Sequence, residues 1–380
     1  MIYLDNASTT MPSDGVKQAV LNTLDLFGNP SSMHRLGIDA EKIIRVAKEN
    51  AAKVIGVKPN NIYFTSGGTE SNNTAILGYC RANCKKGKHI ITTLVEHPSV
   101  LTPFKMLEDE GFELTYLKVN SKGLISLEEL SNSLREDTIF VSIMLVNNEV
   151  GAIMPVSEVK QIIKKKNSKA VFHVDAVQGY GKVDCRVNQW GIDILCASGH
   201  KIHGIKGCGI LYIADNVNVK PLINGGGQQS NIRSGTENTV GIAAFSKASE
   251  EILHYNRDKV NSLRDLLKQE IIKNIERVVI NEADAPNQAG HILNVSFLGI
   301  KAEILLHSLE MYEIYVSTGS ACSSNKPMPS HVLTGMGCSK EGIDGAVRFS
   351  LCENLSEDDI YSTVDALVKE VANIRKYTRK

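Results

Sequence analysis

The side chains that are best able to do chemistry follow short apolar runs in this sequence. One such segment is Phe64–Ser71, which reads Phe-Thr-Ser-Gly-Gly-Thr-Glu-Ser. Gly67 and Gly68 would let the backbone approach a ligand closely, and the amides that begin the next helix would point at an anion. The segment suits a phosphate, although Ser and Thr at a helix start are more often simple caps. It is neither a P-loop nor a GxGxxG motif.

Two further segments place charged side chains at the ends of apolar strands. Asp175 closes the run Phe172-His-Val-Asp. A buried carboxylate there needs a partner, for which a protonated heterocyclic nitrogen would serve, but a helix-capping Asp is the simpler interpretation. Lys201 ends Cys196-Ala-Ser-Gly-His-Lys. Desolvation would lower its pKa and make the amine a nucleophile for a Schiff base, whereas a lysine in a turn is usually a solvated charge.

A cysteine near the C-terminal end lies in a different context. Cys322 is flanked by small polar residues in Val316–Ser324, and Asn325-Lys-Pro-Met-Pro follows. This composition predicts an exposed loop, in which a thiol is a candidate nucleophile. Cys196 and Cys208 lie in apolar runs, so we expect both to be core residues.

The other cysteines do not indicate a metal or a disulfide framework. The chain has 8 cysteines and no CxxC pair. Cys80 and Cys84 would share a helix face, but two ligands do not make a structural zinc site. We therefore predict reduced thiols and no metal.

The candidate residues are separated by alternating strand-like and helical segments, which predicts an α/β domain with a largely parallel sheet. The predicted strands are Ile62–Thr65, His89–Thr93, Glu113–Lys118, Ile139–Val146, Ala170–Asp175, Asp193–Ser198 and Gly209–Ile213. The predicted helices between them include Thr69–Cys84, Val100–Glu110, Leu127–Leu134 and Val156–Lys165. The carboxyl ends of the strands would gather His97, the Asn147–Asn148 pair, Asp175 and Lys201.

The rest of the chain predicts a smaller α+β domain. Glu250–Arg277 is expected to form a long helical connector. Short strands are expected at Ile292–Phe297, Ile314–Ser317 and Ala346–Leu351, with helices at Lys301–Glu310 and Ser356–Arg375. We expect a large domain at residues 13–255, and a small domain made of residues 1–12 and 256–380 that carries the Cys322 loop.

Composition excludes several classes of protein. The 380 residues carry 42 basic and 42 acidic side chains, so a basic nucleic-acid surface is not expected. No apolar run approaches the ~20 residues of a membrane helix. The N-terminus does not resemble a signal peptide, so we expect a cytoplasmic protein without direct contact with membrane or nucleic acid.

Taken together, these motifs resemble the cysteine desulfurases, a branch of the class-V, fold-type I pyridoxal-phosphate (PLP) enzymes. The resemblance extends from Tyr3-Leu-Asp-Asn-Ala7 to Arg348-Phe-Ser350. It includes His-Val-Asp with Gln178 three residues later, Ser-Gly-His-Lys, Arg-Ser-Gly-Thr-Glu and Ser-Ala-Cys-Ser. It implies a large domain with a mainly parallel seven-stranded sheet and a smaller α+β domain.

The resemblance also implies roles for individual residues. Lys201 would bind PLP as a Schiff base, Asp175 would pair with its pyridinium nitrogen, Gln178 would bond its ring hydroxyl, and His97 would stack on the ring and act as an acid–base group. Phosphate binding would fall to Gly68, Thr69, Ser198 and His200, together with Thr236 from a second subunit of a homodimer. Asn148, which would also contact the cofactor, and Arg348 would clamp the carboxylate of the substrate.

The implied reaction takes sulfur from L-cysteine. Cys322 would attack the substrate sulfur and become a persulfide, and alanine would leave. The sulfur would pass to an acceptor protein, either an iron–sulfur scaffold or a tRNA-thiolation enzyme. A selenocysteine lyase or another class-V aminotransferase is the alternative. A non-catalytic scaffold is disfavoured, because Lys201 and Asp175 are both present.

Overall fold

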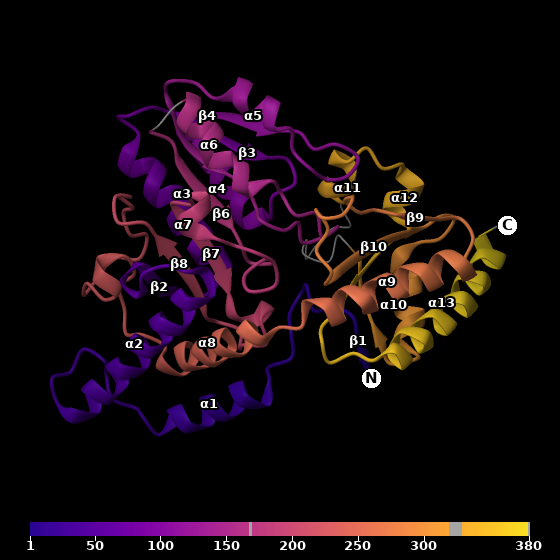
Figure 1. The fold of residues 1–380 in the computed structure, drawn as a ribbon, viewed down its shortest axis with the longest axis horizontal. Coiled ribbons are helices and arrows are strands. Elements are labelled where there is room, and N and C mark those ends of the chain that lie inside the picture. Colours follow the sequence, from indigo (N-terminus) through magenta and orange to yellow (C-terminus); the bar gives the residue numbers. More distant parts are fainter. Residues whose placement is uncertain (167–168, 319–328, 379–380) are drawn as a thin grey trace.

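The computed structural model describes residues 1–166, 169–318 and 329–378, so Cys322 lies outside the described residues. The ribbon in Figure 1 has two regions side by side. One region is built on a seven-stranded sheet, and the other contains a four-stranded sheet. The division into domains at residues 12/13 and 255/256 stays a prediction.

The larger region is organised by its seven-stranded sheet, in the order β2-β8-β7-β6-β5-β3-β4. Strand β8 is antiparallel to both of its neighbours, and the other strands run parallel to one another. This matches the predicted mainly parallel seven-stranded sheet. The strands are β2 (Ile62–Thr65), β3 (His89–Thr93), β4 (Glu113–Leu117), β5 (Thr138–Ser142), β6 (Val171–Asp175), β7 (Ile194–Ser198) and β8 (Gly209–Ile213).

Helices cover both faces of this sheet, which explains why its central strands are buried along their whole length. Apolar residues of α3 and α4 pack on one face, and those of α2, α6 and α8 pack on the other. The helices of this region are α1 (Asp14–Leu24), α2 (Arg35–Ile55), α3 (Gly68–Asn83), α4 (Pro98–Asp109), α5 (Leu127–Ser133), α6 (Val156–Lys166), α7 (Val187–Trp190) and α8 (Thr239–Glu251).

The smaller region has an antiparallel four-stranded sheet in the order β12-β13-β10-β9. Its strands are β9 (Val278–Ile280), β10 (Ile292–Phe297), β12 (Ser317–Thr318) and β13 (Ala346–Ser350). Its helices are α9 (Arg257–Asn274), α10 (Ala302–Glu310), α11 (His331–Gly335), α12 (Lys340–Asp344) and α13 (Glu357–Thr378). A separate apolar core joins α9, α10 and α13 to this sheet.

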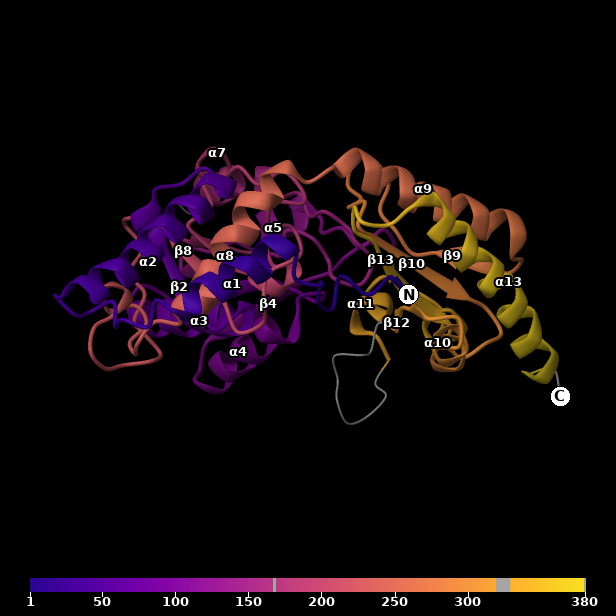
Figure 2. The ribbon, with the colours of Figure 1, turned by 90° about the horizontal axis from the view of Figure 1, so that it is seen from below.

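The N-terminal segment connects the two regions. Strand β1 (Ile2–Tyr3) pairs in parallel with β11 (Ile314–Tyr315) of the smaller region. A few residues later, the amide of Thr10 donates to the carbonyl of His200 in the larger region. Figure 2 shows the N-terminus beside the four-stranded sheet and the C-terminus at the far end of α13.

Three predicted elements were wrong in detail. The strand predicted at Ile139–Val146 ends at Ser142. The expected helix at Glu250–Arg277 is interrupted, because the side chain of Asn256 accepts from the amide of Lys259 and begins α9 as a new helix. The expected strand at Ile314–Ser317 is divided between two sheets, since β11 pairs with β1 while β12 pairs with β13.

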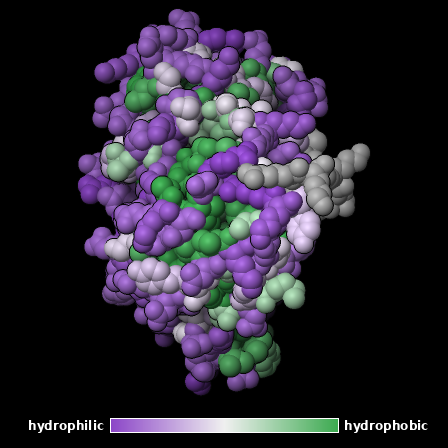
Figure 3. Space-filling view, turned by 90° about the vertical axis from the view of Figure 1, so that its right-hand side faces the viewer, coloured by the Kyte–Doolittle hydropathy of each residue, from purple (hydrophilic) through white to green (hydrophobic). Residues whose placement is uncertain are grey.

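The exposed face of the smaller region is mainly hydrophilic (Figure 3). Seen from the end that carries the smaller region, hydrophilic residues cover most of this face, and hydrophobic residues gather near its centre (Figure 3). Within residues 1–166, 169–318 and 329–378, no helix is both long and apolar enough to cross a membrane. The same residues contain no group of three or more His, Cys, Asp or Glu side chains that could hold a metal.

Candidate active site

A cavity of about 290 Å³ lies at the carboxyl ends of β6 and β7. The structure brings ten of the predicted site residues together around it. They are Gly68, Thr69, His97, Asn148, Asp175, Gln178, Ser198, His200, Lys201 and Arg348. Thr236 instead lines a separate cavity next to Thr65 and Arg233. The predicted nucleophile, Cys322, lies outside the described residues.

The first turn of α3 forms one wall of the cavity. Gly67 has φ +150°, which side chains rarely adopt, and as the N-cap it offers no side chain to the helix amides. A Cβ at Gly68 would come within 2.7 Å of Cγ2 of Val177, so glycine keeps this approach open. Amides at a helix start that no side chain caps attract anions. The turn therefore fits a phosphate.

Asp175 is held in the cavity wall by two donors. Its side chain is 4% exposed. Nδ2 of Asn72 donates to Oδ2 over 2.7 Å, and the amide of Val177 donates to Oδ1 over 2.9 Å. Both bonds fix the orientation of the side chain, so the carboxyl group suits a cationic ligand atom.

His97 is held by Ser99 on the adjacent turn of the chain. The amide of Ser99 donates to Nδ1 over 3.1 Å, and the hydroxyl of Ser99 lies 2.8 Å from the same atom. The hydroxyl also accepts from Nδ2 of Asn72 over 2.9 Å, which leaves its own hydrogen for His97. Since Nδ1 accepts, the ring proton belongs on Nε2. Burial lowers the pKa of His97, with Lys201 and His331 acting in the same direction against Asp175.

Lys201 follows β7 in a short 3-10 turn and reaches the N-terminal segment. Its Nζ donates to the carbonyls of Ala7 and Ser8, each over 2.6 Å. The amide side chain of Gln178 donates to the same Ala7 carbonyl over 2.8 Å. Residues near the start of the chain thus position the lysine, a role that no local sequence signal had indicated.

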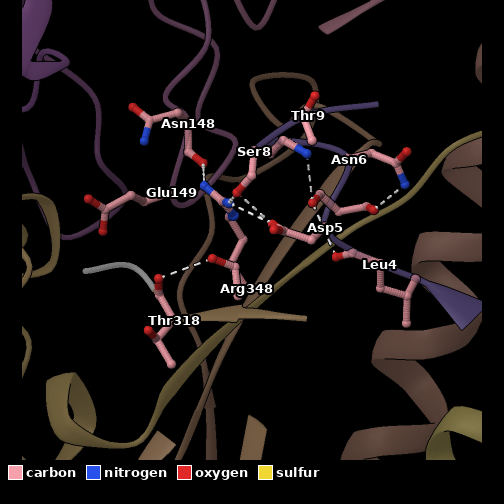
Figure 4. A network of polar contacts seen from close by, with 12 residues as sticks. Leu4, Asp5, Asn6, Ser8, Thr9, Asn148, Glu149, Thr318 and Arg348 are labelled. Atoms are coloured by element: carbon pink, nitrogen blue, oxygen red, sulfur yellow. Dashed lines mark hydrogen bonds and ion pairs between the residues drawn. The ribbon is translucent and has the colours of Figure 1, made fainter. Parts of the chain in front are cut away.

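Arg348 enters from β13 and faces the same segment (Figure 4). Its guanidinium donates to the carbonyl of Asn148 over 2.8 Å, to Asp5 over 2.9 Å and to the hydroxyl of Ser8 over 2.7 Å. Its Nε has no partner among the described residues. The arginine is therefore fixed in direction and keeps one N–H unsatisfied.

Burial shifts the pKa values of three other titratable groups near the cavity. Burial raises the pKa of Glu96 to about 8, so this carboxyl keeps its proton at neutral pH. Burial also raises the pKa of Glu149, although Ser330 donates to it over 2.5 Å. His200 has its pKa lowered to about 4 by burial, then by Lys201. His200 is therefore neutral at pH 7 and can donate or accept without adding charge.

Comparison with known proteins identifies the family. Residues 2–362 match the sequence model of the family described as Aminotransferase class-V. A protein of Methanosarcina thermophila named Cysteine desulfurase IscS is 43% identical over 387 residues, covering 100% of this chain and 95% of that protein.

The chain belongs to the cysteine desulfurases.

Solved desulfurase-like structures agree with this assignment and with the fold. A structure named "NIFS-LIKE PROTEIN" has a TM-score of 0.92 and 37% identity, and the match covers 98% of this chain and 99% of that one. A structure named "SspA in complex with cysteine" has a TM-score of 0.82 and 33% identity over 93% of this chain and 99% of that one. Cysteine desulfurases are PLP enzymes of fold type I, and the sheet described above is that of this fold.

Sequence reasoning missed several residues that position the side chains of this cavity. Asn72 and Ser99 link Asp175 to His97, yet each could equally be an ordinary polar residue in a helix. Ala7 and Ser8 act through backbone carbonyls, which side-chain patterns do not record. The segment Tyr3–Ala7 carries part of the family resemblance, but its position in the site follows only from the folded chain.

Proposed function

We propose that the cavity binds PLP and that its residues take the roles expected from their motifs. This proposal rests mainly on the observation that ten of the predicted site residues, from distant parts of the sequence, line one cavity. An orphaned atom supports the fit, because Oε1 of Gln178 is buried without a partner among the described residues. A ring hydroxyl would satisfy it. The turn at Gly67 and Gly68, next to Ser198 and His200, would take the phosphate.

When bound, PLP supplies an electron sink for the Cα carbon of the substrate. Asp175, held in position by Asn72 and Val177, would pair with a protonated ring nitrogen. Lys201 would bond the cofactor through its Nζ, which lies at the cavity beside the carbonyls of Ala7 and Ser8. Those carbonyls would accept from the lysine whenever it is released and protonated.

His97 and Arg348 would act on the substrate. With Nδ1 occupied by Ser99, His97 would deliver or hold a proton at Nε2. Arg348 and Asn148 would bind the substrate carboxylate, and the unpartnered Nε of Arg348 provides one donor. Asp5 and Ser8 keep the guanidinium in place, so the substrate need not order it on binding.

Cys322 would be the sulfur acceptor. Its thiolate would attack the sulfur of L-cysteine, forming an S–S bond as the substrate's Cβ–S bond breaks. The products are a persulfide on Cys322 and L-alanine, so L-cysteine and one enzyme thiol supply all atoms. The solved relative SspA, which is in complex with cysteine, supports this choice of substrate. An iron–sulfur scaffold or tRNA-thiolation enzyme would then receive the sulfur, in the cytoplasm.

A homodimer is part of the same proposal. Thr236 lies in a cavity distinct from the PLP cavity of its own chain, so it would complete the phosphate site of a second subunit. The segment from α1 to the start of α2 exposes apolar side chains that a partner would cover. The most exposed of them are Leu21, Leu24, Phe27, Met33 and Ile38.

The test measures alanine and sulfide formed from L-cysteine, with PLP and a thiol reductant, by the native chain and by Cys322→Ala. Native activity with an inactive variant that stays yellow supports the proposal. Cys84→Ala, a half-buried thiol away from the cavity, is the matched control and should keep full activity. Full activity of Cys322→Ala with L-cysteine would overturn the nucleophile assignment and favour a selenocysteine lyase or another elimination.

A further inference from the structure

A second cavity, of about 450 Å³, lies where the loop after β6 meets the start of α9 and the segment before β10. Its polar wall includes Lys182, Tyr255 and His291. Ile153, Val183, Trp190, Val260 and Ala289 supply apolar wall. None of these residues has a role in the reaction described above.

Lys182 is a buried cation without a partner. Its side chain is 6% exposed, and its ammonium group has no hydrogen-bond or ion-pair partner within the described parts of the chain. Burial lowers its pKa to about 7, and the positive charge of Lys201 acts in the same direction. Leaving an ammonium group buried and unpaired is costly, so an anion beside it would be strongly stabilising.

Two uncharged groups of the cavity wall also lack partners. The hydroxyl of Tyr255 and Nε2 of His291 are both buried with no hydrogen bond in the described structure. Burial holds the pKa of His291 well below its usual value, while a hydrogen bond to the backbone of Gln178 opposes that shift. That bond must use Nδ1–H, so Nε2 presents a lone pair. The wall therefore offers donors at Lys182 and Tyr255 and an acceptor at His291.

None of the charged groups described near Lys182 pairs with its ammonium group. Asp184 is already paired with Arg257 over 2.7 Å. Lys201 repels it, and the thiol of Cys352 is held in its neutral form because burial raises its pKa. Glu353 faces Tyr255 and Cys352 and accepts from the amide of Asn256 over 3.0 Å. An added anion is thus the missing partner.

We propose that this second cavity binds a small oxyanion that carries its own O–H group, such as hydrogen phosphate or bicarbonate. The oxygens of the anion accept from Nζ of Lys182 and the hydroxyl of Tyr255. Its O–H donates to Nε2 of His291. A chloride ion can pair with the ammonium but cannot donate to the histidine, and a fully deprotonated oxyanion would face the lone pair of that ring.

The test is isothermal titration calorimetry on the protein with PLP bound, so that phosphate cannot enter the first cavity. Sodium phosphate, bicarbonate and chloride are titrated separately at constant ionic strength near pH 7. The expected result is saturable binding of phosphate or bicarbonate in the millimolar range, with chloride weaker by about tenfold, because one hydrogen bond to a charged ligand is lost. The stronger oxyanion identifies which source the site prefers.

Two variants assign the binding to this cavity. Lys182→Met removes the ammonium with little change in side-chain volume and should abolish the oxyanion binding, while Lys206→Met, at an exposed position, should not change it. If Lys182→Met fails to fold, His291→Phe tests the acceptor and should lower oxyanion affinity toward that of chloride. Absence of saturable binding by native protein, unchanged binding in Lys182→Met, or equal affinity for chloride would each overturn the proposal. None of these outcomes depends on desulfurase activity.

Discussion

The two cavities differ in whether their polar side chains have hydrogen-bond partners within the protein. In the first, Asn72 bonds both Asp175 and Ser99, and Ser99 bonds His97, so one chain of hydrogen bonds holds Asp175 and His97 in place. In the second, the hydroxyl of Tyr255 and Nε2 of His291 have no hydrogen-bond partner among the described residues, and the ammonium group of Lys182 has no counter-charge there. The side chains of the first cavity are therefore arranged before a ligand binds. The polar groups of the second cavity would gain hydrogen bonds and a counter-charge mainly from a ligand.

The largest expected effect on activity comes from changing a charge in the first cavity. Asp175→Asn should lower alanine formation by about 10²-fold or more, because a neutral amide cannot hold a protonated ring nitrogen as a carboxylate does. Steady-state kinetics with L-cysteine measure this effect.

A second variant separates charge from hydrogen bonding. In the double variant Asn72→Asp/Asp175→Asn, the pair can again share a hydrogen bond, but the charge has moved to α3. Stability measured by thermal unfolding should recover relative to Asp175→Asn, and activity should not. Recovery of activity together with stability would mean that the position of the charge does not matter.

The next effect is the contribution of Lys182 to the pH dependence of stability. The pKa of Lys182 is about 7 in the folded chain, and about 10.4 is usual for an unfolded lysine. Between these values the unfolded chain binds more protons, so this residue makes the free energy of unfolding increase with pH. The increase is at most about 1.4 kcal/mol per pH unit.

Urea unfolding at pH 7 and pH 9 measures this contribution. The difference between native protein and Lys182→Met should shift in favour of the native protein as the pH rises. The same shift should become smaller in phosphate, because a bound anion stabilises the ammonium form. An identical pH dependence in both proteins would contradict the burial of an unpaired cation.

The smallest effect tests the link between Ser99 and His97. Ser99→Ala removes the hydroxyl that donates to Nδ1 of the neutral ring, so the pKa of His97 should rise from its lowered value. A hydrogen bond of about 1 kcal/mol corresponds to a shift of under one pH unit and a several-fold change in rate. The acid limb of the pH–rate profile should move to higher pH by that amount. Ser99→Thr keeps a hydroxyl and should leave the profile in place.

Much of the fold could be predicted because strands and their end residues have local signals. The strands Ile62–Thr65, His89–Thr93 and Gly209–Ile213 were predicted with the bounds that the structure shows. Their apolar runs end in turns, and the carboxyl ends of parallel strands meet at one edge. For that reason, Asp175 and Lys201 were expected together and do line one cavity.

The features that the sequence did not predict depend on contacts between distant segments. Lys182 was not singled out, because the cost of burying it arises only when α9 and the segment before β10 pack beside it. Asn72 lies on a helix where any polar residue is tolerated, and only the position of β6 makes it a donor to Asp175. The break before α9 required a capping interaction at Asn256 that helical periodicity does not show.

The position of the N-terminal segment has a consequence for the order of events during synthesis. The carbonyls that accept from Lys201 belong to residues made 194 and 193 positions earlier, and Asp5 precedes its partner Arg348 by 343 positions. The residues around Asp5 must therefore wait for the synthesis of the smaller region before they can dock, since β1 also pairs with β11. Lys201 consequently acquires its final surroundings only after β13 has been translated.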